Sequence, residues 1–331
     1  MKKRIISLAI ALLLVCGMPV SAFAEEYDLA TGSITVTANE GGQSVTQVNG
    51  VSDHQETTPT VITQHDSSTP TTNTVTINAA ENATANVTIQ DVNIVISDPA
   101  GSTQNHSGDA AVTIDVADKA SVNVTLDGVN IDTRNTGSVS QNQYGDPVYN
   151  SGEAAVQITG NGDVTLELDG DNTLWSGNNR AGVEKNTIAA TSTNPGNGNG
   201  NLTITDENGT AGSLESTGGL DGSGIGGGHD RSGSNITITG TAEVTAQGGQ
   251  SGAGIGGGAY RDGSNINISG SAEVTANGGY GGAGIGGGFG GSGSDITITD
   301  NAEVTAQGGA DSAGIGGAAD SGSNITISGN A

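Results

Sequence analysis

The chain is poor in the residues that most folded proteins use for cross-links and bulky cores. Its 331 residues include one cysteine, Cys16, and only 2% aromatic residues. Without a second cysteine no internal disulfide can form, which excludes a disulfide-framed fold. Aromatic side chains bring much of the buried area of large globular cores, so their scarcity excludes a core of that kind. Proline is also rare, with 6 residues, which argues against a proline-rich disordered chain.

Basic residues and long apolar runs are scarce as well. Nine Lys and Arg stand against 35 Asp and Glu, and the formal net charge is −26. A chain this acidic repels polyanions, so we exclude nucleic acid as a partner, whereas cations and neutral sugars fit better. The longest apolar run, from Ile5 to about Val15, is too short to cross a bilayer, and no membrane span is expected.

Residues 1–24 have the parts of a secretory signal peptide. Three basic residues precede the apolar run, and Ala22-Phe23-Ala24 offers a cleavage site before Glu25. Removing those three basic residues changes the formal net charge from −26 to −29. We therefore expect a secreted, extracellular protein, and its acidity also suits a soluble extracellular surface.

Glycine, by contrast, is abundant, with 57 residues, and much of it lies in a tandem repeat of about 30 residues. Each unit contains the pieces N-I-T-I-T, A-E-V-T-A and G-A-G-I-G-G-G, separated by turn residues. The first two pieces alternate apolar and polar residues, as half-buried strands do. The sequence predicts an all-β, right-handed parallel β-helix (a solenoid) with three short strands per coil of about 30 residues.

Stacking of coils places equivalent residues ~4.8 Å apart, so the inward columns can be named. They are Ile236, Ile266, Ile296 and Ile325; Ile238, Ile268, Ile298 and Ile327; Val244, Val274 and Val304; and Ile225, Ile255, Ile285 and Ile315. A further column precedes the first strand and consists of Asn201, Asn235, Asn265, Asp295 and Asn324. We expect its side chains to form a ladder that closes a turn.

The glycine piece at 252–257 also fits G-x-G-x-x-G, the fingerprint of dinucleotide-binding proteins. That site needs a helix after the glycines, whereas here the piece occurs four times and no helical pattern follows it. A phosphate-binding loop would need a Lys-Ser/Thr pair, which is missing. We expect glycine there because the third face bends, packs closely and requires positive φ.

The repeat divides the chain in two after the signal peptide. Residues 25–200 carry the strand pattern without a strict period, and we predict irregular coils with loop insertions at 49–72, 134–152 and 176–200. Residues 201–331 form the regular coils. Because the sequence stops as another unit begins, we expect a truncated C-terminus, with cell-wall attachment through a missing region.

Two groups of acidic residues are candidate calcium ligands. Glu243, Glu273 and Glu303 should stack in one outward column, where like charges require water or a cation between them. Asp169 and Asp171 flank a glycine, as in part of a calcium loop. Calcium prefers such oxygen ligands and is the candidate cofactor, although the glutamates can also splay into water.

Three aromatic residues fall in or beside the long loops, namely Tyr144, Tyr149 and Trp175. Aromatic rings can stack on sugar rings, which makes the three candidates for carbohydrate binding, while a local role in filling a loop is the alternative. Catalysis has little support, because the four histidines show no metal-binding spacing. We therefore predict that the protein is not an enzyme.

The G-G-x-x-G-A-G-I-G-G-G pattern with N-I-T-I-T-G-x-A-E-V-T-A resembles β-helix repeats of secreted Firmicutes surface proteins, described as carbohydrate-binding-domain or adhesin-like. The resemblance covers about 150–331 and implies binding to a polysaccharide or a host or cell-surface glycan. β-Helix polysaccharide hydrolases share this architecture, but their Gly-His-Gly and Arg-x-Lys motifs are missing. A structural stalk that presents another domain and a polysaccharide lyase or hydrolase are the alternatives. The ligand and the binding face stay open.

Overall fold

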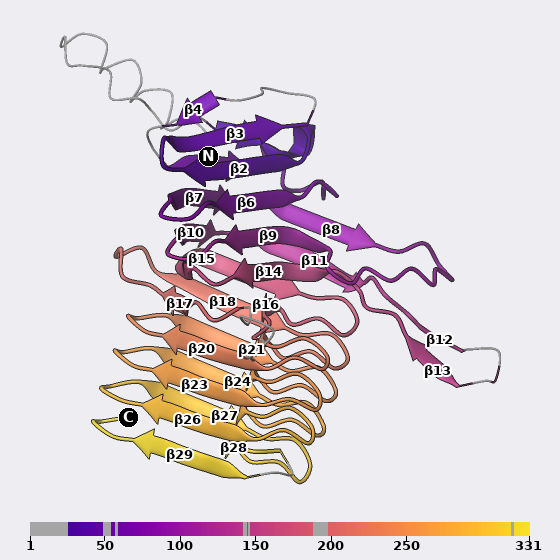
Figure 1. The fold of residues 1–331 in the computed structure, drawn as a ribbon, viewed down its shortest axis with the longest axis vertical. Helices are drawn as coiled ribbons and strands as arrows, with labels where there is room; N and C mark the ends of the chain where they lie inside the picture. The colour runs from indigo at the N-terminus through magenta and orange to yellow at the C-terminus, as the bar shows by residue number, and fades with distance from the viewer. Residues whose placement is uncertain are drawn as a thin grey trace.

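The computed structural model describes residues 26–48, 54–56, 59–141, 144, 146–187, 198–318 and 321–331. The described chain is 51% strand and 1% helix, and its strands are stacked in coils along one long axis (Figure 1). The predicted fold class, an all-β parallel β-helix with three short strands per coil, is confirmed. The predicted signal peptide, residues 1–24, lies outside the described residues.

Two faces of the coil share one sheet of 16 strands within the described residues, because the long strand β15 (Asp163–Trp175) takes part in both. The first face also contains β1 (Glu26–Asp28), β5 (Thr60–Thr63), β7 (Thr84–Gln90), β10 (Ser121–Asp127), β17 (Leu202–Thr205), β20 (Gly233–Ile238), β23 (Gly263–Ile268), β26 (Gly293–Ile298) and β29 (Gly322–Ile327). The second face also contains β8 (Asn93–Ser97), β11 (Asn130–Asn135), β18 (Gly212–Thr217), β21 (Glu243–Gln247), β24 (Glu273–Asn277) and β27 (Glu303–Gln307).

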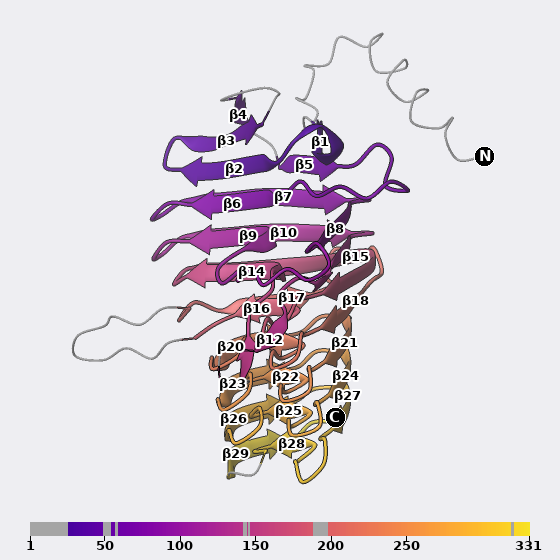
Figure 2. The same ribbon diagram turned by 90° about the vertical axis from the view of Figure 1, so that its right-hand side faces the viewer.

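The third face is a separate sheet, of 11 strands in the part of the chain that is described. Its strands are β4 (His54–Glu56), β3 (Gly42–Gln47), β2 (Ile34–Asn39), β6 (Val75–Ala79), β9 (Ala110–Val116), β14 (Ala154–Gly160), β16 (Val183–Lys185), β19 (Ile225–Gly226), β22 (Ile255–Gly256), β25 (Ile285–Gly286) and β28 (Ile315–Gly316). Figure 2 shows β2, β6, β9 and β14 stacked one above the other. All neighbours in this sheet are parallel except at its N-terminal end, where β3 pairs antiparallel with β2 and β4. A single 3-10 turn in the described chain, η1 (Leu29–Thr31), follows β1.

The aliphatic columns lie in register, as predicted. Ile236 pairs with Ile266, and the column continues through the next two coils, while the columns of Val244 and Ile225 are aligned in the same way. Ile266 is 1% exposed because coils cover it from both sides, whereas Ile327 is 58% exposed in β29, on which no described coil stacks. Each such side chain contributes ~1.5–3 kcal/mol when fully buried, so a coil gains its core from its neighbours.

The predicted ladder of Asn and Asp side chains is present in two steps within the first-face strands, while Asn201 instead donates to Oδ1 of Asp163. Asn265 donates from Nδ2 to Oδ1 of Asn235 at 2.7 Å, and Asn324 donates to Oδ1 of Asp295 at 2.9 Å. These four residues have φ between 49° and 57°, a conformation in which Asn and Asp are well tolerated. The ladder therefore bends the chain and joins successive coils.

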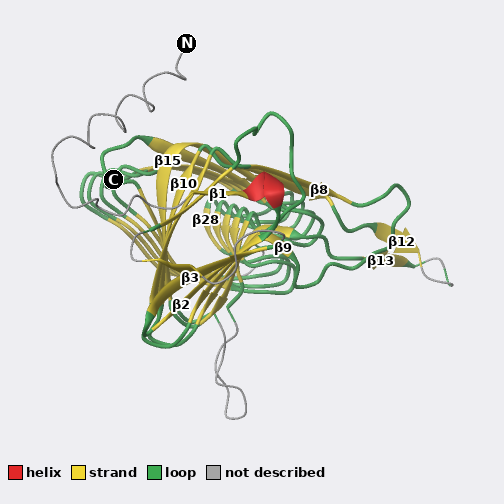
Figure 3. Cartoon of the chain, turned by 90° about the horizontal axis from the view of Figure 1, so that it is seen from above, coloured by secondary structure: helices red, strands yellow, loops and turns green. Residues whose placement is uncertain are grey.

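Two of the three segments predicted as loop insertions contain strands of the stack, whereas the third, 134–152, is an insertion as predicted. Segment 49–72 contains β5, whose Ile62 is buried, and segment 176–200 contains β16, whose Val183 is buried. Segment 134–152 contains an antiparallel hairpin of β12 (Val139–Gln141) and β13 (Pro147–Tyr149). Figures 1 and 3 show this hairpin standing out from the stack, beyond the end of β11.

Candidate functional site

A candidate site lies where the hairpin leaves the stack. Strand β11 ends near the hairpin, and in the next coil β15 ends at Trp175, which pairs with Asp132 of β11. The coil after that contributes Thr217, which pairs with Trp175 from the other side. Three coils and the hairpin base therefore meet around the one tryptophan of the chain.

A cavity of about 470 Å³ opens at this point. Its lining consists of Arg134, Gly137, Ser138, Val139, Trp175, Ser176, Asn178, Thr217, Gly218, Gly219 and Leu220. The indole of Trp175 and the apolar Val139 and Leu220 provide non-polar surface, and Arg134, Asn178 and Thr217 provide hydrogen-bonding groups. Small-molecule sites combine apolar walls and a few polar groups in a cavity of ~300–1,000 Å³, and this cavity meets that description.

Arg134 is held over the indole by its neighbours. Its Cζ lies 3.7 Å from the ring centroid of Trp175. Asp132 fixes the guanidinium from the other side, with Nη2 of Arg134 at 2.7 Å from Oδ2 and Nε at 3.0 Å from Oδ1. A guanidinium over an indole at a partly exposed site gains ~0.5–1 kcal/mol. Trp175 and Arg134 thus form a preformed stacked pair that brings an aromatic ring and hydrogen-bond donors to the cavity.

The structure places the two predicted tyrosines away from this cavity. Tyr149 lies on β13, is 49% exposed and pairs with Val139, which does line the cavity. Tyr144 lies in the loop of the hairpin and is 80% exposed. Of the three aromatic candidates, Trp175 alone lines the cavity, and the hairpin reaches it through Val139.

The predicted calcium ligands lie elsewhere. Glu243, Glu273 and Glu303 stack in register on β21, β24 and β27 with exposed side chains. Asp169 and Asp171 belong to β15 and accept hydrogen bonds, from Asn208 Nδ2 at 2.8 Å and from Ser213 Oγ at 3.0 Å respectively. Calcium binding by these five residues stays a prediction.

Asn172, which follows the predicted calcium pair, has a structural role. It is 1% exposed, and its Nδ2 donates to the carbonyl oxygens of Leu126, Asp169, Gly170 and Ser213. Its Oδ1 accepts from the backbone N–H of Val129 at 2.9 Å. The side chain therefore satisfies the backbone of a corner between faces and is not available to an ion.

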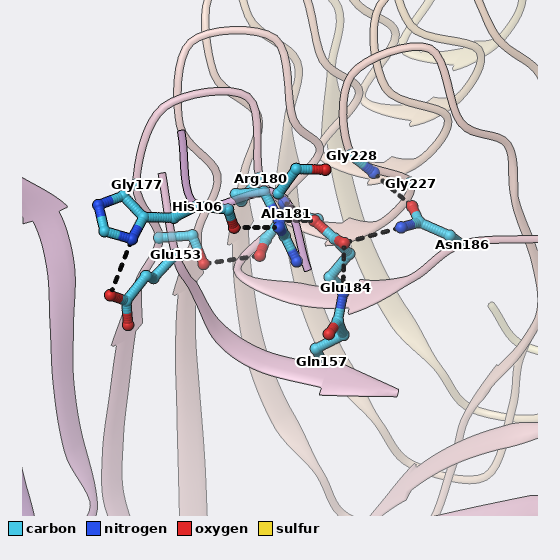
Figure 4. Close-up of polar contacts among 12 residues, drawn as sticks. His106, Glu153, Gln157, Gly177, Arg180, Ala181, Glu184, Asn186, Gly227 and Gly228 are labelled. Atoms are coloured by element: carbon cyan, nitrogen blue, oxygen red, sulfur yellow. Dashed lines mark hydrogen bonds and ion pairs between the residues drawn. The ribbon is translucent and has the colours of Figure 1, made fainter. Parts of the chain in front are cut away.

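A buried polar cluster lies on the third face beside β16 (Figure 4). Glu184, 2% exposed, accepts at Oε2 from Nε of Arg180 at 2.8 Å and from the backbone N–H of Ala181 at 3.1 Å. Its Oε1 accepts from Nε2 of Gln157 at 3.3 Å and from Nδ2 of Asn186 at 2.7 Å. Four donors thus compensate one buried carboxylate, as a buried charge requires.

Two basic residues on either side of Glu184 in the sequence are also buried, and Nη2 of Arg180 has no hydrogen-bond partner among the described residues. Arg180 donates from Nη1 to the carbonyl oxygen of His106 at 3.2 Å. Lys185 is 1% exposed, and its Nζ donates to the carbonyl oxygens of Gly198 at 2.7 Å and Ser234 at 3.0 Å. Burial lowers the pKa of Lys185 to about 8.

Sequence reasoning assigned this cluster to a loop, although a signal was present. Val183 pairs with Ile225 and Glu184 pairs with Gly226, so R-A-G-V-E-K-N at 180–186 occupies the place of the repeated G-A-G-I-G-G-G. Charged residues stand where the regular coils have glycine. Aligning the two segments by their central aliphatic residue would have indicated both the strand and the exceptional polar positions.

Comparisons of the chain with protein-family models, with curated proteins and with solved structures find no match. In the described part of the chain, no helix has the length and apolarity needed to span a membrane.

Proposed function

We propose that the protein is a non-catalytic, extracellular carbohydrate-binding or adhesin-like protein of a bacterial surface, and that the cavity at Trp175 is its sugar site. The observation that carries the proposal is the preformed pair of Trp175 and Arg134 in that cavity. A sugar ring has an apolar face of C–H groups and a rim of hydroxyls. Arg134 covers one face of the indole, so the part of the Trp175 ring that lines the cavity, together with Val139, suits the apolar face, and the donors of Arg134 and Asn178 suit the rim.

Other features of the chain support the same proposal. Its net charge of −26 favours neutral glycans over polyanions. The signal-peptide pattern supports an extracellular location, and the repeat resembles those of secreted Firmicutes surface proteins. The elongated stack also fits the alternative of a stalk that presents another domain (Figure 1). A stalk, however, has no need of a lined cavity.

The test is a glycan array with the purified chain, followed by calorimetry with the best-bound oligosaccharide, with and without calcium. Trp175→Ala should weaken binding ~5- to 100-fold, because losing one central aromatic contact costs ~1–3 kcal/mol. Arg134→Lys keeps the charge but loses the planar fork, so we expect a smaller loss. Tyr280→Ala removes an aromatic residue that is 72% exposed on a regular coil and serves as the control.

Two outcomes would refute the proposal. Absence of binding to any glycan, with or without calcium, would reject the carbohydrate-binding function. Binding that Trp175→Ala and Tyr280→Ala affect equally would reject the site.

A further inference from the structure

Two acidic residues on the third face stack on each other in consecutive coils. The sequence contains G-D-A-A-V-T-I at 108–114 and G-E-A-A-V-Q-I at 152–158. Ala154 pairs with Ala110 and its N–H donates to the carbonyl oxygen of Asp109 at 3.1 Å, so Asp109 and Glu153 occupy equivalent positions one coil apart. Such neighbours lie ~4.8 Å apart in backbone spacing, and two carboxylates there repel each other unless a cation lies between them.

The loop between β8 and β9 places an imidazole against both carboxylates. Nδ1 of His106 lies 3.3 Å from Oδ2 of Asp109 and 3.4 Å from Oε1 of Glu153 (Figure 4 shows the contact with Glu153). Nε2 lies 2.8 Å from Oδ1 of Asp98, whose other oxygen accepts from the N–H of Gly137 at 2.9 Å. The ligand atoms of His106, Asp109 and Glu153 all lie within 4.8 Å of one another, and they form the one such group of three in the described chain.

The two nitrogen–oxygen distances are compatible with ligands that share one metal ion. Charge-assisted N–H···O bonds are ~2.7–2.9 Å long, as the bond to Asp98 is. Ligands held at ~2.0–2.1 Å around a tetrahedral ion are separated by ~3.3–3.4 Å, the length of the tetrahedron edge. The contacts of Nδ1 have that length.

Asp98 has the position of a carboxylate that orients a metal-binding histidine. In the tautomer with its proton on Nε2, His106 donates to Asp98, and the lone pair of Nδ1 faces Asp109 and Glu153. Carboxylates in this second position are common behind metal-binding imidazoles, because they fix the tautomer and raise the basicity of the ligand.

The local charge balance also calls for a cation. Three carboxylates surround one imidazole, and the side chains of His106, Asp98 and Glu153 are only 14%, 10% and 12% exposed. The guanidinium of Arg180 lies nearby, pairs with Glu184 at 2.8 Å and leaves its Nη2 buried without a hydrogen-bond partner in the described part of the chain.

We propose that His106, Asp109 and Glu153 bind one divalent transition-metal ion, with Zn²⁺ the best match, and that Asp98 orients the histidine. One imidazole nitrogen with two carboxylates suits Zn²⁺, whereas Ca²⁺ takes six to eight oxygens. The side chain of Asp109 is 63% exposed, which leaves room for a water ligand on the outer side. This site shares no residue with the acidic groups predicted to bind calcium.

The experiment uses the purified chain, freed of metal with a chelator. Titration with Co²⁺ is followed by its visible absorption, and titration with Zn²⁺ by calorimetry at pH 7.5. We expect one ion to bind per chain. Asp109→Asn and Glu153→Gln should each weaken binding at least ~10-fold.

The control is Glu273→Gln, on the exposed glutamate column, which should bind the ion as the wild type does. Asp109→Asn changes a largely exposed side chain, and circular dichroism will verify that it folds. Failure to bind Co²⁺ or Zn²⁺ with a stoichiometry of one would overturn the proposal, as would equal affinity in the wild type and Asp109→Asn. Tighter binding of Ca²⁺ than of Zn²⁺ at these residues would overturn the assignment of the metal.

Discussion

The requirement for glycine on the third face can be tested at Gly256, which follows the isoleucine of one G-A-G-I-G-G-G segment. Its φ is +130°, and a Cβ added there would lie 2.1 Å from the carbonyl oxygen of Gly286 in the next coil. A Cβ added at Gly286 would likewise lie 2.0 Å from the carbonyl oxygen of Gly316 in the following coil. The coils therefore approach each other with no room for a side chain, and Gly256→Ala forces two coils apart.

The expected cost has two parts. Positive φ costs an alanine ~1–2 kcal/mol. Relieving the overlap with the backbone by moving a coil costs ~1–3 kcal/mol more, as overpacking of a core does. Gly209→Ala is the matched control, because Gly209 has φ of +87° and no atom within 4 Å of an added Cβ, so it reports the first part alone.

Urea unfolding followed by circular dichroism measures both variants. Each coil is stabilised by its neighbours, so a variant could also change how many coils unfold together. Urea midpoints are therefore compared only between variants whose unfolding transitions have the same slope. We expect Gly256→Ala to lose ~2–5 kcal/mol and Gly209→Ala ~1–2 kcal/mol. Equal losses in the two variants would refute close packing as the reason for glycine in the third face.

Two further predictions concern charge. Glu273→Gln relieves repulsion from Glu243 and Glu303, so it should raise the urea midpoint of unfolding at low salt. In 1 M NaCl the repulsion is screened and we expect no effect. A lower midpoint in the variant at low salt would argue against repulsion. Burial lowers the pKa of Lys185 to about 8, so between pH 8 and 10.5 the unfolded chain binds a proton that the folded chain has lost. The wild type should therefore gain stability over Lys185→Met across that range, on the order of 3 kcal/mol, and parallel stability–pH curves would contradict this.

The regular coils could be predicted from the sequence because two independent patterns agree there. The alternation within N-I-T-I-T decides which side chains face inward, and the 30-residue period decides which residues stack. Parallel pairing then fixes the register, as the pair of Ile236 and Ile266 confirms. A shift of one residue would turn the whole column outward, so the pattern admits one solution.

The prediction from the sequence was wrong where either the apolar–polar alternation or the 30-residue period was missing. Val61 and Ile62 form part of β5, but Thr, Ser and Pro around them indicated a loop. Val183 lies among Arg, Glu and Lys, and charge normally indicates an exposed segment. Here the charges are buried because they pair with one another and with backbone carbonyls, which composition does not reveal.

The candidate sites depend on contacts between coils that lie about 40 residues apart. Trp175 could be selected from the sequence because it is the one tryptophan, but Arg134 could not, since its contact requires β11 and β15 to be neighbours. The stacking of Asp109 and Glu153 was readable from the two G-[DE]-A-A-V segments. The position of His106 was not, because it depends on the path of an irregular loop.

Variants of Arg180 and Glu184 test whether these two polar residues stabilise each other at positions where the following coils have glycine. Arg180→Gly leaves Glu184 buried without its cation, at a cost of ~3–5 kcal/mol, and Glu184→Gly leaves Arg180, 5% exposed, in the same condition. The double variant restores the glycines found in the following coils and leaves no buried charge at these two positions. It should therefore be more stable than either single variant in urea unfolding, with a large coupling energy. If the loss of stability in the double variant equals the sum of the losses in the two single variants, each charge is stabilised by other groups. The two residues would then not act as a pair in place of glycine.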